Sequence, residues 1–306
     1  MSTGSIWRLP ACVVALLSMY GLAYATENGG SVYPVGVETV LTGVQPRPGE
    51  TRIYEYTLFY AANEFNDGHG KSAVPEFKLR VFANAIKVTH NWGVPFLGGT
   101  IESQIGVPLV YEQLHVATGK YAAFGLTNVN VIPVNVNYEK GSLHWYYEVD
   151  MFPAGAGYSA THVVNIGQHN IAIAPTGGIT CLPLHGKAEF SSRFMYIFNG
   201  YDRATHYHSG NEFLWEYNAD YEITKKIAAG FNGYLYRQTT NDTSQGAAFD
   251  GGFRGRDLAL GPQVRCPLGK RGAFALKYYR DTLVQNKPRG NAFWFQFSLP
   301  IGKSAS

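Results

Sequence analysis

The feature that most constrains this chain is a two-residue alternation of apolar and polar side chains, which recurs along many short segments. From 213 to 223, every odd position is apolar or aromatic, and the even positions are Glu, Asn or Asp except at Leu214. Successive side chains of a β-strand point to opposite faces, so such a segment is a strand with one apolar and one polar face. Segments 143–152 and 291–301 show similar alternation. We therefore predict an all-β fold.

The pattern yields twelve predicted strands, most with the roughly 9–11 residues that a tilted membrane strand needs. The connections between them alternate between long and short. In an outer-membrane barrel, the loops at the cell exterior are long, the periplasmic turns are short and the strand number is even. The predicted strands are 52–61, 77–91, 99–111, 125–137, 143–152, 170–182, 187–198, 211–223, 227–238, 256–266, 272–280 and 291–301. The long connections are 62–76, 112–124, 153–169, 199–210, 239–255 and 281–290.

A secreted β-sandwich is the main alternative, because it also contains many alternating strands. A sandwich does not require connections of alternating length, and it keeps its charged residues on the outer surface. Here the polar face contains charges of both signs with Tyr and Gln between them, which suits a water-filled lumen. We therefore predict an antiparallel transmembrane β-barrel of about 12 strands. We interpret two breaks in the alternation, near Ile86 and Pro133, as bulges or wrong strand boundaries.

Composition excludes other classes of protein. The net charge of +3 is small and dispersed, whereas a nucleic-acid-binding protein concentrates basic residues on one face. Beyond residue 25 there is no apolar run of the roughly 18 residues that a spanning helix needs. Only 15% of the residues are charged, against about 25% in ordinary soluble domains. The composition is therefore compatible with a membrane β-barrel.

The chain divides into four expected parts. Residues 1–25 are expected to be a secretory signal peptide, with an apolar stretch that ends in Ala23-Tyr24-Ala25. Residues 26–50 are rich in Gly and Pro and are expected to form a short periplasmic or lumen-inserted segment. Residues 51–302 form the predicted barrel and 303–306 a C-terminal tail. The exported part contains Cys181 and Cys266, and the sequence leaves open whether they pair.

Short motifs along almost the whole exported length provide a family resemblance. The chain resembles the outer-membrane barrel family labelled putative meta-pathway of phenol degradation, whose members are regarded as transporters. The resemblance implies passive or facilitated entry of small hydrophobic, often aromatic, molecules, and it implies no catalytic residue. The matching motifs are 30–38 (GSVYPVGVE), 46–49 (PRPG), 60–62 (YAA), 209–213 (SGNEF), 234–238 (YLYRQ), 254–256 (RGR), 260–263 (LGPQ) and 290–294 (GNAFW).

Candidate functional residues are those on the polar face of the strands, which would line the lumen. Opposed charges would orient water and bias the passage of solutes, and aromatic rings could stack on an aromatic solute. The alternative is that the same ion pairs and hydroxyls only fill and brace a small barrel. The charged candidates are Glu148, Asp150, Lys187, Glu189, Arg193, Glu212, Glu216, Asp220, Arg265 and Lys277, and the aromatic ones are Tyr146, Tyr234, Tyr236, Tyr279 and Trp294.

Aromatic residues near the predicted strand ends would suit the two interfacial girdles of a membrane barrel. They are Trp92, Tyr111, Trp145, Tyr221, Tyr278 and Tyr279.

Two other kinds of site have weaker support in the sequence. His206 and His208, with Asp202 nearby, have donor atoms that suit zinc, but solvated loop residues are the ordinary explanation. A barrel enzyme that modifies lipids would need a Ser and His pair, such as Ser159 with His162 or Ser209 with His208. No G-x-S-x-G elbow supports it. We therefore predict no catalytic residue, no metal and no cofactor.

The sequence thus predicts a bacterial outer-membrane channel for uptake of small hydrophobic or aromatic compounds. Its expected partners are outer-membrane lipid, such solutes and the outer-membrane assembly machinery, with no nucleic acid. One alternative is a structural or adhesive barrel with a closed lumen that binds a partner through its exterior loops. A lipid-modifying barrel enzyme is the other.

Overall fold

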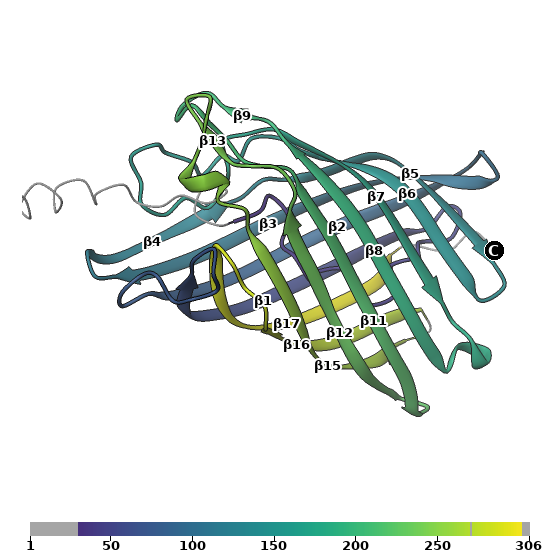
Figure 1. Cartoon of the computed structure of the whole chain (residues 1–306). Helices are drawn as coiled ribbons and strands as arrows, with labels where there is room; N and C mark the ends of the chain where they lie inside the picture. Colours follow the sequence, from purple (N-terminus) through teal and green to yellow (C-terminus); the bar gives the residue numbers. More distant parts are fainter. Residues whose placement is uncertain (1–29, 270, 302–306) are drawn as a thin grey trace, which may run out of the picture.

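The computed structural model describes residues 30–269 and 271–301, and in this part of the chain twelve strands close into an antiparallel barrel (Figure 1). Each strand pairs with the next along the chain, and β17 closes the barrel against β1. The fold prediction is therefore confirmed. The barrel strands are β1 (Thr51–Asn66), β2 (Lys78–Phe96), β3 (Gly99–Val116), β5 (Asn130–Lys140), β6 (Leu143–Phe152), β7 (Ala172–Cys181), β8 (Ala188–Asn199), β11 (Glu212–Thr224), β12 (Ile227–Gln238), β15 (Arg256–Leu268), β16 (Gly272–Asp281) and β17 (Lys287–Ile301).

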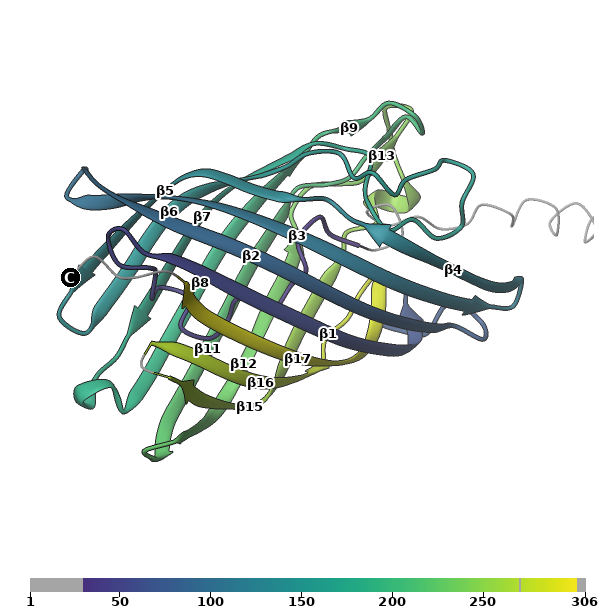
Figure 2. The same cartoon turned by 180° about the vertical axis from the view of Figure 1, so that it is seen from behind.

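The long connections gather at one end of the barrel and the short turns at the other, as Figures 1 and 2 show. We call the end with the long connections the exterior end. Its loops contain a small sheet of four two-residue strands and a 3-10 turn, and the short-turn end contains a second 3-10 turn. These elements are β9 (Tyr201–Asp202), β10 (Tyr207–His208), β13 (Thr243–Ser244), β14 (Ala247–Ala248), η2 (Asp250–Gly252) and, at the short-turn end, η1 (Leu184–Gly186).

One predicted long connection is wrong. Residues 112–124 do not form a loop, because β3 continues to Val116 and then pairs with β4 (Gly119–Leu126) in a hairpin that extends beyond the barrel. The predicted strand at 125–137 is accordingly shifted, and the barrel strand β5 begins at Asn130. A two-residue turn at 117–118 closes this hairpin. That turn lies within the predicted long connection 112–124.

The two breaks in the alternation have different origins. Around Pro133 the pairing of β5 with β6 shifts register between Val131 and Asn135, so this break is a true irregularity. Around Ile86 the pairing of β1 with β2 is continuous, so the interpretation as a bulge or a wrong boundary is wrong there. The apparent break arises because small alanines occupy the inward positions and the polar Asn84 lies on the outward face.

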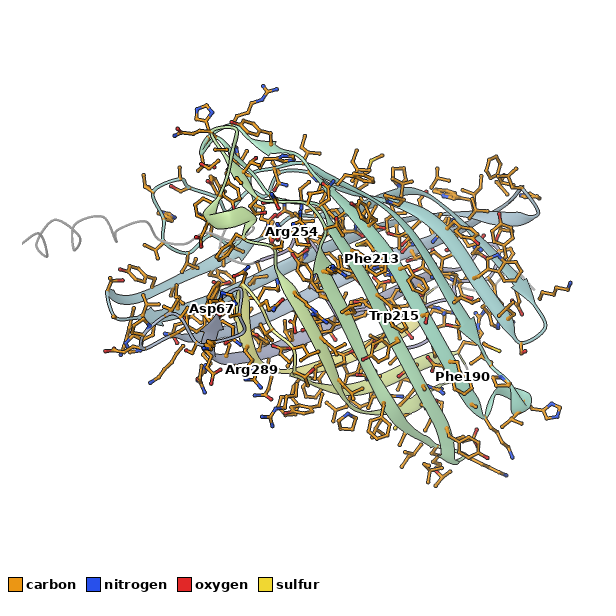
Figure 3. The ribbon with its side chains drawn as sticks, in the orientation of Figure 1. Asp67, Phe190, Phe213, Trp215, Arg254 and Arg289 are labelled. Carbon is orange, nitrogen blue, oxygen red and sulfur yellow. The ribbon has the colours of Figure 1, made fainter. Side chains whose placement is uncertain are left out.

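The outer surface of the barrel is apolar because one face of each strand presents large hydrophobic side chains. Phe59, Phe190 and Phe231 are each about half exposed or more. Figure 3 shows Phe190, Phe213 and Trp215 on the outside of the wall. Such a continuous apolar wall is the surface that a hydrocarbon bilayer requires.

Of the predicted girdle residues, Trp92, Tyr111 and Tyr221 are exposed, whereas Tyr279 is fully buried in the lumen and its girdle assignment is wrong. Trp145 and Tyr278 are partly exposed.

Three further expectations concern other parts of the chain. The predicted signal peptide, residues 1–25, and the tail, residues 303–306, lie outside the described residues. Cys181 and Cys266 are both free thiols. Among the described residues there is no helix that could span a membrane.

Candidate functional site

Residues 30–50, named here the lumen segment, run through the inside of the barrel. Near the exterior end, Ser31 Oγ donates a hydrogen bond to Glu212 at the start of β11. Further along, the backbone N–H of Gly43 donates to Thr180 Oγ1 (2.9 Å). At the short-turn end, the N–H of Gly49 donates to the carbonyl of Asn91 (2.9 Å). The segment, purple in Figures 1 and 2, therefore extends from one end of the lumen toward the other.

Glycine allows the lumen segment to approach the wall closely. A Cβ atom at Gly43 would lie 2.5 Å from the backbone nitrogen of Thr180 and 2.6 Å from the carbonyl oxygen of His144. Gly36 has a φ of +89°, and a Cβ there would lie 2.9 Å from the ring of Tyr279. Neither position has room for a side chain, which explains the glycines in this part of the sequence.

The centre of the lumen is organised around one arginine of β8. Arg193 is buried, and its guanidinium lies 3.3 Å from Glu148 Oε1 and 3.5 Å from Asp150 Oδ1, both on β6. It also lies 3.9 Å from Glu216 on β11 and 3.8 Å from Glu38 of the lumen segment. A guanidinium can serve several carboxylates at once because its five N–H groups point in fixed, divergent directions. Arg193 thus ties three elements together.

Aromatic groups complete the surroundings of Arg193. Its Nε donates a hydrogen bond of 3.0 Å to the hydroxyl of Tyr146, and its guanidinium stacks over the ring of Tyr33 with its carbon 4.7 Å from the ring centroid. Tyr33 belongs to the lumen segment, and its hydroxyl donates to Glu216 (3.0 Å). The lumen segment therefore contributes both a ring and a carboxylate to this centre.

Two lysines of the wall hold the lumen segment from the opposite side. Lys87 on β2 donates to Glu38 Oε1 (2.7 Å). Lys277 on β16 donates to the backbone carbonyls of Gly36 (3.0 Å) and Val37 (2.7 Å). Backbone carbonyls that would be orphaned inside the barrel are satisfied in this way.

A second ion-pair group lies toward the short-turn end. Arg265 on β15 contacts Glu189 on β8 (3.0 Å) and Asp220 on β11 (2.8 Å). Gln263 donates to the same Asp220 carboxylate (2.7 Å). The N–H of Leu41 donates to Glu189 (2.6 Å), so this group also holds the lumen segment.

Phenol groups and carboxylates meet in the exterior half of the lumen. The hydroxyl of Tyr234 lies 3.0 Å from Asp257 Oδ2 and 2.9 Å from Asp281 Oδ1, and the hydroxyl of Tyr60 donates to Asp281 Oδ2 (2.9 Å). The ammonium of Lys287 lies 4.0 Å from the ring centroid of Tyr236. This part of the lumen thus binds phenol side chains by both ring and hydroxyl.

Aromatic side chains also fill the exterior mouth, and we name this group the mouth cluster. Phe65 contacts Phe77 edge to face, with ring centroids 5.7 Å apart, and stacks on Phe253 at 6.4 Å. Tyr60 packs both against this cluster and against the central apolar cluster, which includes Tyr234. An apolar track therefore connects the mouth with the middle of the lumen. The cluster consists of Ala62, Phe65, Phe77 and Phe253, with Tyr60, Val74, Leu79, Leu114, Val116 and Phe249 packed against it.

The structure places fourteen of the fifteen predicted lumen residues on the inner face of the wall. Lys187 is the exception, because it is exposed in the turn before β8 and its predicted lumen position is wrong. Arg265 is half-buried and the others are buried. The inward residues are Tyr146, Glu148, Asp150, Glu189, Arg193, Glu212, Glu216, Asp220, Tyr234, Tyr236, Arg265, Lys277, Tyr279 and Trp294.

Several residues that hold the lumen segment are not evident from the sequence. Lys87 has the inward parity of β2, but the apparent break near Ile86 hid it. Lys287 begins β17, inside a predicted long connection. Glu38 lies in a Gly/Pro-rich segment without strand periodicity, so the alternation pattern could not identify it.

The alternative sites are not assembled. Among the described residues, no three His, Cys, Asp or Glu side chains are grouped to hold a metal ion. His208 Nε2 donates to the carbonyl of Asn199 (2.9 Å), and its neighbour Ser209 is buried. Ser159 Oγ pairs with Thr161 Oγ1 (3.1 Å) and makes no hydrogen bond to the ring of His162. Neither serine is thus paired with a histidine in the described part of the chain.

Comparison with known proteins agrees with this architecture. The chain superposes on the crystal structure of an outer membrane channel from Pseudomonas putida F1 with a TM-score of 0.71 at 13% identity, covering 84% of this chain and 97% of that one. The KdgM porin gives a TM-score of 0.47 at 10% identity and 82% and 99% coverage. The transport unit of the autotransporter AIDA-I from Escherichia coli gives 0.47 at 10% identity and 92% and 100% coverage.

At the sequence level, no curated protein matches the chain significantly. Residues 62–297 match the model of the family described as "Putative MetA-pathway of phenol degradation". That match spans more than half of the chain and ten of its barrel strands in full. The chain therefore belongs to this family and is a β-barrel of the bacterial outer membrane.

Proposed function

We propose that this barrel is a channel for uptake of small hydrophobic or aromatic compounds, which enter through the mouth cluster. The observation that carries the proposal is the position of Tyr60, which packs against both the mouth cluster and the central cluster. An aromatic solute that leaves Phe65 and Phe253 would therefore meet further rings. Aromatic pairs gain about 0.5–1.5 kcal/mol beyond the area they bury, which is enough to favour such solutes without trapping them.

The polar groups along this track support a phenolic solute in particular. Asp257 and Asp281 accept hydrogen bonds from the phenol groups of Tyr60 and Tyr234. A phenolic solute has the same ring and the same hydroxyl, so it could exchange with either tyrosine at these carboxylates. The family to which the chain belongs supports the same class of compound.

Passage through the lumen requires the lumen segment to move. Its contacts with the wall include hydrogen bonds and ion pairs, for example from Glu216, Glu189 and Lys277. Water can replace such contacts, because each contributes only about 0.5–3 kcal/mol net. We therefore propose that the described arrangement is the closed form and that conduction follows displacement of residues 30–50.

The test compares the full exported chain with a variant that lacks residues 30–45, both in planar bilayers. The full chain is expected to conduct little. The shortened chain is expected to show larger discrete steps that phenol or toluate reduces. Liposome flux of the same solutes provides a second readout. Insertion of both proteins without aromatic-dependent block or flux in either one would contradict the proposal.

The filled lumen also supports one alternative, a structural or adhesive barrel that acts through its exterior loops. The hydrogen bonds of Ser31 and Gly49 place the lumen segment at both ends of the barrel, as a permanent plug would require. The experiment above separates the two functions, because a permanent plug predicts no solute flux in the full chain.

A further inference from the structure

Two arginines face each other on the outer side of the wall near the exterior end. Arg237 on β12 is the direct cross-strand partner of Arg256 on β15, and both side chains are exposed. Like charges directly opposite one another destabilise a sheet. Neither arginine makes a hydrogen bond or an ion pair through its side chain with any residue in the described ranges 30–269 and 271–301. The barrel wall thus holds two adjacent cations without a counter-charge of its own.

A pocket of about 520 Å³ surrounds this pair. Arg254 adds a third guanidinium to it, and no carboxylate lines it. Arg254 Nε donates to Asn241 Oδ1 (2.8 Å), which fixes that side chain at the rim, as Figure 3 shows near the exterior loops. The other residues of the pocket provide polar groups and one ring: Phe213, Gln238, Thr239, Gly255 and Gln285.

The pocket lies at the upper edge of the apolar wall. Phe213 is the cross-strand partner of Arg237, so these residues stand in one row with Arg256. Two residues further along the strands, about 7 Å toward the other end, the corresponding row is Trp215, Leu235 and Leu258. The guanidinium groups therefore stand at the boundary between the lipid-facing surface and the exterior loops.

Three cations without a carboxylate, at the edge of the lipid-facing surface, favour an anionic lipid headgroup as the ligand of this pocket. We propose that Arg237, Arg254 and Arg256 bind the phosphate groups of an outer-leaflet glycolipid, whose acyl chains lie along the row formed by Trp215, Leu235 and Leu258. Arginine binds phosphate with two parallel N–H bonds, and clusters of basic residues at the membrane surface attract anionic headgroups. The proposal is independent of whether the lumen conducts.

A neighbouring strand extends the cationic surface. Arg280 on β16 is exposed on the outer side of the wall, one strand away from Arg256, and makes no ion pair with a described residue.

Native mass spectrometry of the full exported chain in detergent provides the test, with bisphosphorylated lipid A as probe. Arg237→Gln together with Arg256→Gln is expected to weaken lipid A binding about tenfold or more. Each basic residue near the membrane surface strengthens the attraction of anionic headgroups, and this variant removes two of them. The control is Lys225→Gln with Lys226→Gln, which removes the same charge from the opposite end of the same β-hairpin. Heat-modifiable migration on a gel verifies that both variants are folded.

Three outcomes decide the proposal. Weaker lipid A binding in the arginine variant only, and weaker binding of dephosphorylated lipid A to the unchanged protein, would support it. Equal binding by the arginine variant and the lysine variant would overturn it. Full displacement of lipid A by inorganic phosphate would also overturn it, because the pocket would then be a site for a soluble anion.

Discussion

The ammonium of Lys87, on the wall of the barrel, lies 2.7 Å from a carboxylate oxygen of Glu38 in the lumen segment. The second oxygen of Glu38 lies 3.8 Å from the guanidinium of Arg193 on the other side of the lumen. Glu38 therefore links two strands that do not pair with one another. This position makes the Glu38 carboxylate the side chain best placed to hold the lumen segment against the wall.

Glu38→Gln is expected to loosen the lumen segment. Loss of one partner of a buried ion pair costs about 3 kcal/mol or more, because the remaining cation is left without compensation. Here Lys87 loses its paired carboxylate, whereas Arg193 loses one of four. We expect larger and more frequent conductance steps in planar bilayers and a lower urea midpoint for loss of the heat-modifiable band.

The matched control for this variant is Glu139→Gln, the same chemical change at an exposed carboxylate. Unchanged conductance in both variants would show that Glu38 does not hold the segment in place.

Phe253→Ala is expected to weaken recognition of aromatic solutes at the mouth. The ring of Phe253 stacks on Phe65 and contacts Phe249, so its removal opens the mouth cluster. One aromatic contact is worth about 1 kcal/mol, which corresponds to about a fivefold loss in block by a small aromatic compound. Titration of single-channel block provides the measurement.

The control is Phe190→Ala, which removes the same ring from the lipid-facing surface, where Figure 3 shows it. An equal loss of block in this variant would argue against a specific role of the mouth cluster.

Gly178→Ala is expected to disturb the centre of the lumen from a distance. A Cβ at this position would overlap the ring of Tyr146. The hydroxyl of Tyr146 accepts a hydrogen bond from Arg193 and lies 3.3 Å from Thr42 Oγ1 of the lumen segment. Forcing a group into a packed interior costs about 1–3 kcal/mol. The urea midpoint should fall accordingly.

Gly125→Ala provides the reference for this change, because a Cβ there meets no atom within 4 Å. It should leave the urea midpoint close to that of the unchanged protein. If both substitutions have the same effect, the contact between Gly178 and Tyr146 has no role in stability.

The sequence predicts those parts of this structure in which residues alternate with a two-residue period. Strands such as β11 were predicted well because one face must be apolar for lipid and the other can be charged. The pattern also placed Arg193 and Lys277 inside the lumen, where both are buried. Lys187 fits the same parity but precedes the first residue of β8, and periodicity alone cannot locate a strand end to within one residue.

The lumen segment could not be predicted in the same way. It has no periodicity, and its path depends on contacts between residues far apart in the sequence, such as Ser31 with Glu212. The convergence of four carboxylates on Arg193 has the same origin, since β6 and β11 lie on either side of β8 in the sheet and the lumen segment adds Glu38. Such convergence depends on which segments become neighbours in the fold and not on any local pattern.

A compact loop joins the two phenylalanines of the mouth cluster. Phe65 and Phe77 are separated by residues 66–76, yet their rings meet at 5.7 Å. Asp67 helps to hold this loop in its compact form, because its carboxylate accepts hydrogen bonds from the backbone N–H groups of His69 (2.8 Å) and Lys71 (2.9 Å). The N–H of Lys71, followed by that of His69, lowers the pKa of Asp67 below its ordinary value.

A depressed carboxyl pKa fixes the sign of the pH dependence. The folded loop is favoured at pH values above the ordinary pKa of Asp, about 3.9, and this contribution is lost as the pH falls through the lower pKa of the folded state. Asp67→Asn should therefore reduce the hydrogen-exchange protection of residues 67–77 at pH 7, whereas the variant and the unchanged protein should become alike once the pH falls below the lowered pKa of Asp67.

Glu76→Gln is the control within the same loop, because the Glu76 side chain is largely exposed and only approaches His115 at 3.8 Å. Protection should be measured by mass spectrometry and corrected for the intrinsic exchange rate at each pH. Since the loop positions Phe65 and Phe77, the Asn variant should also weaken aromatic block at neutral pH. Normal loop protection in Asp67→Asn would mean that the loop is held by its backbone contacts alone, such as the hydrogen bond from the Asn286 N–H to the Asp67 carbonyl (3.2 Å).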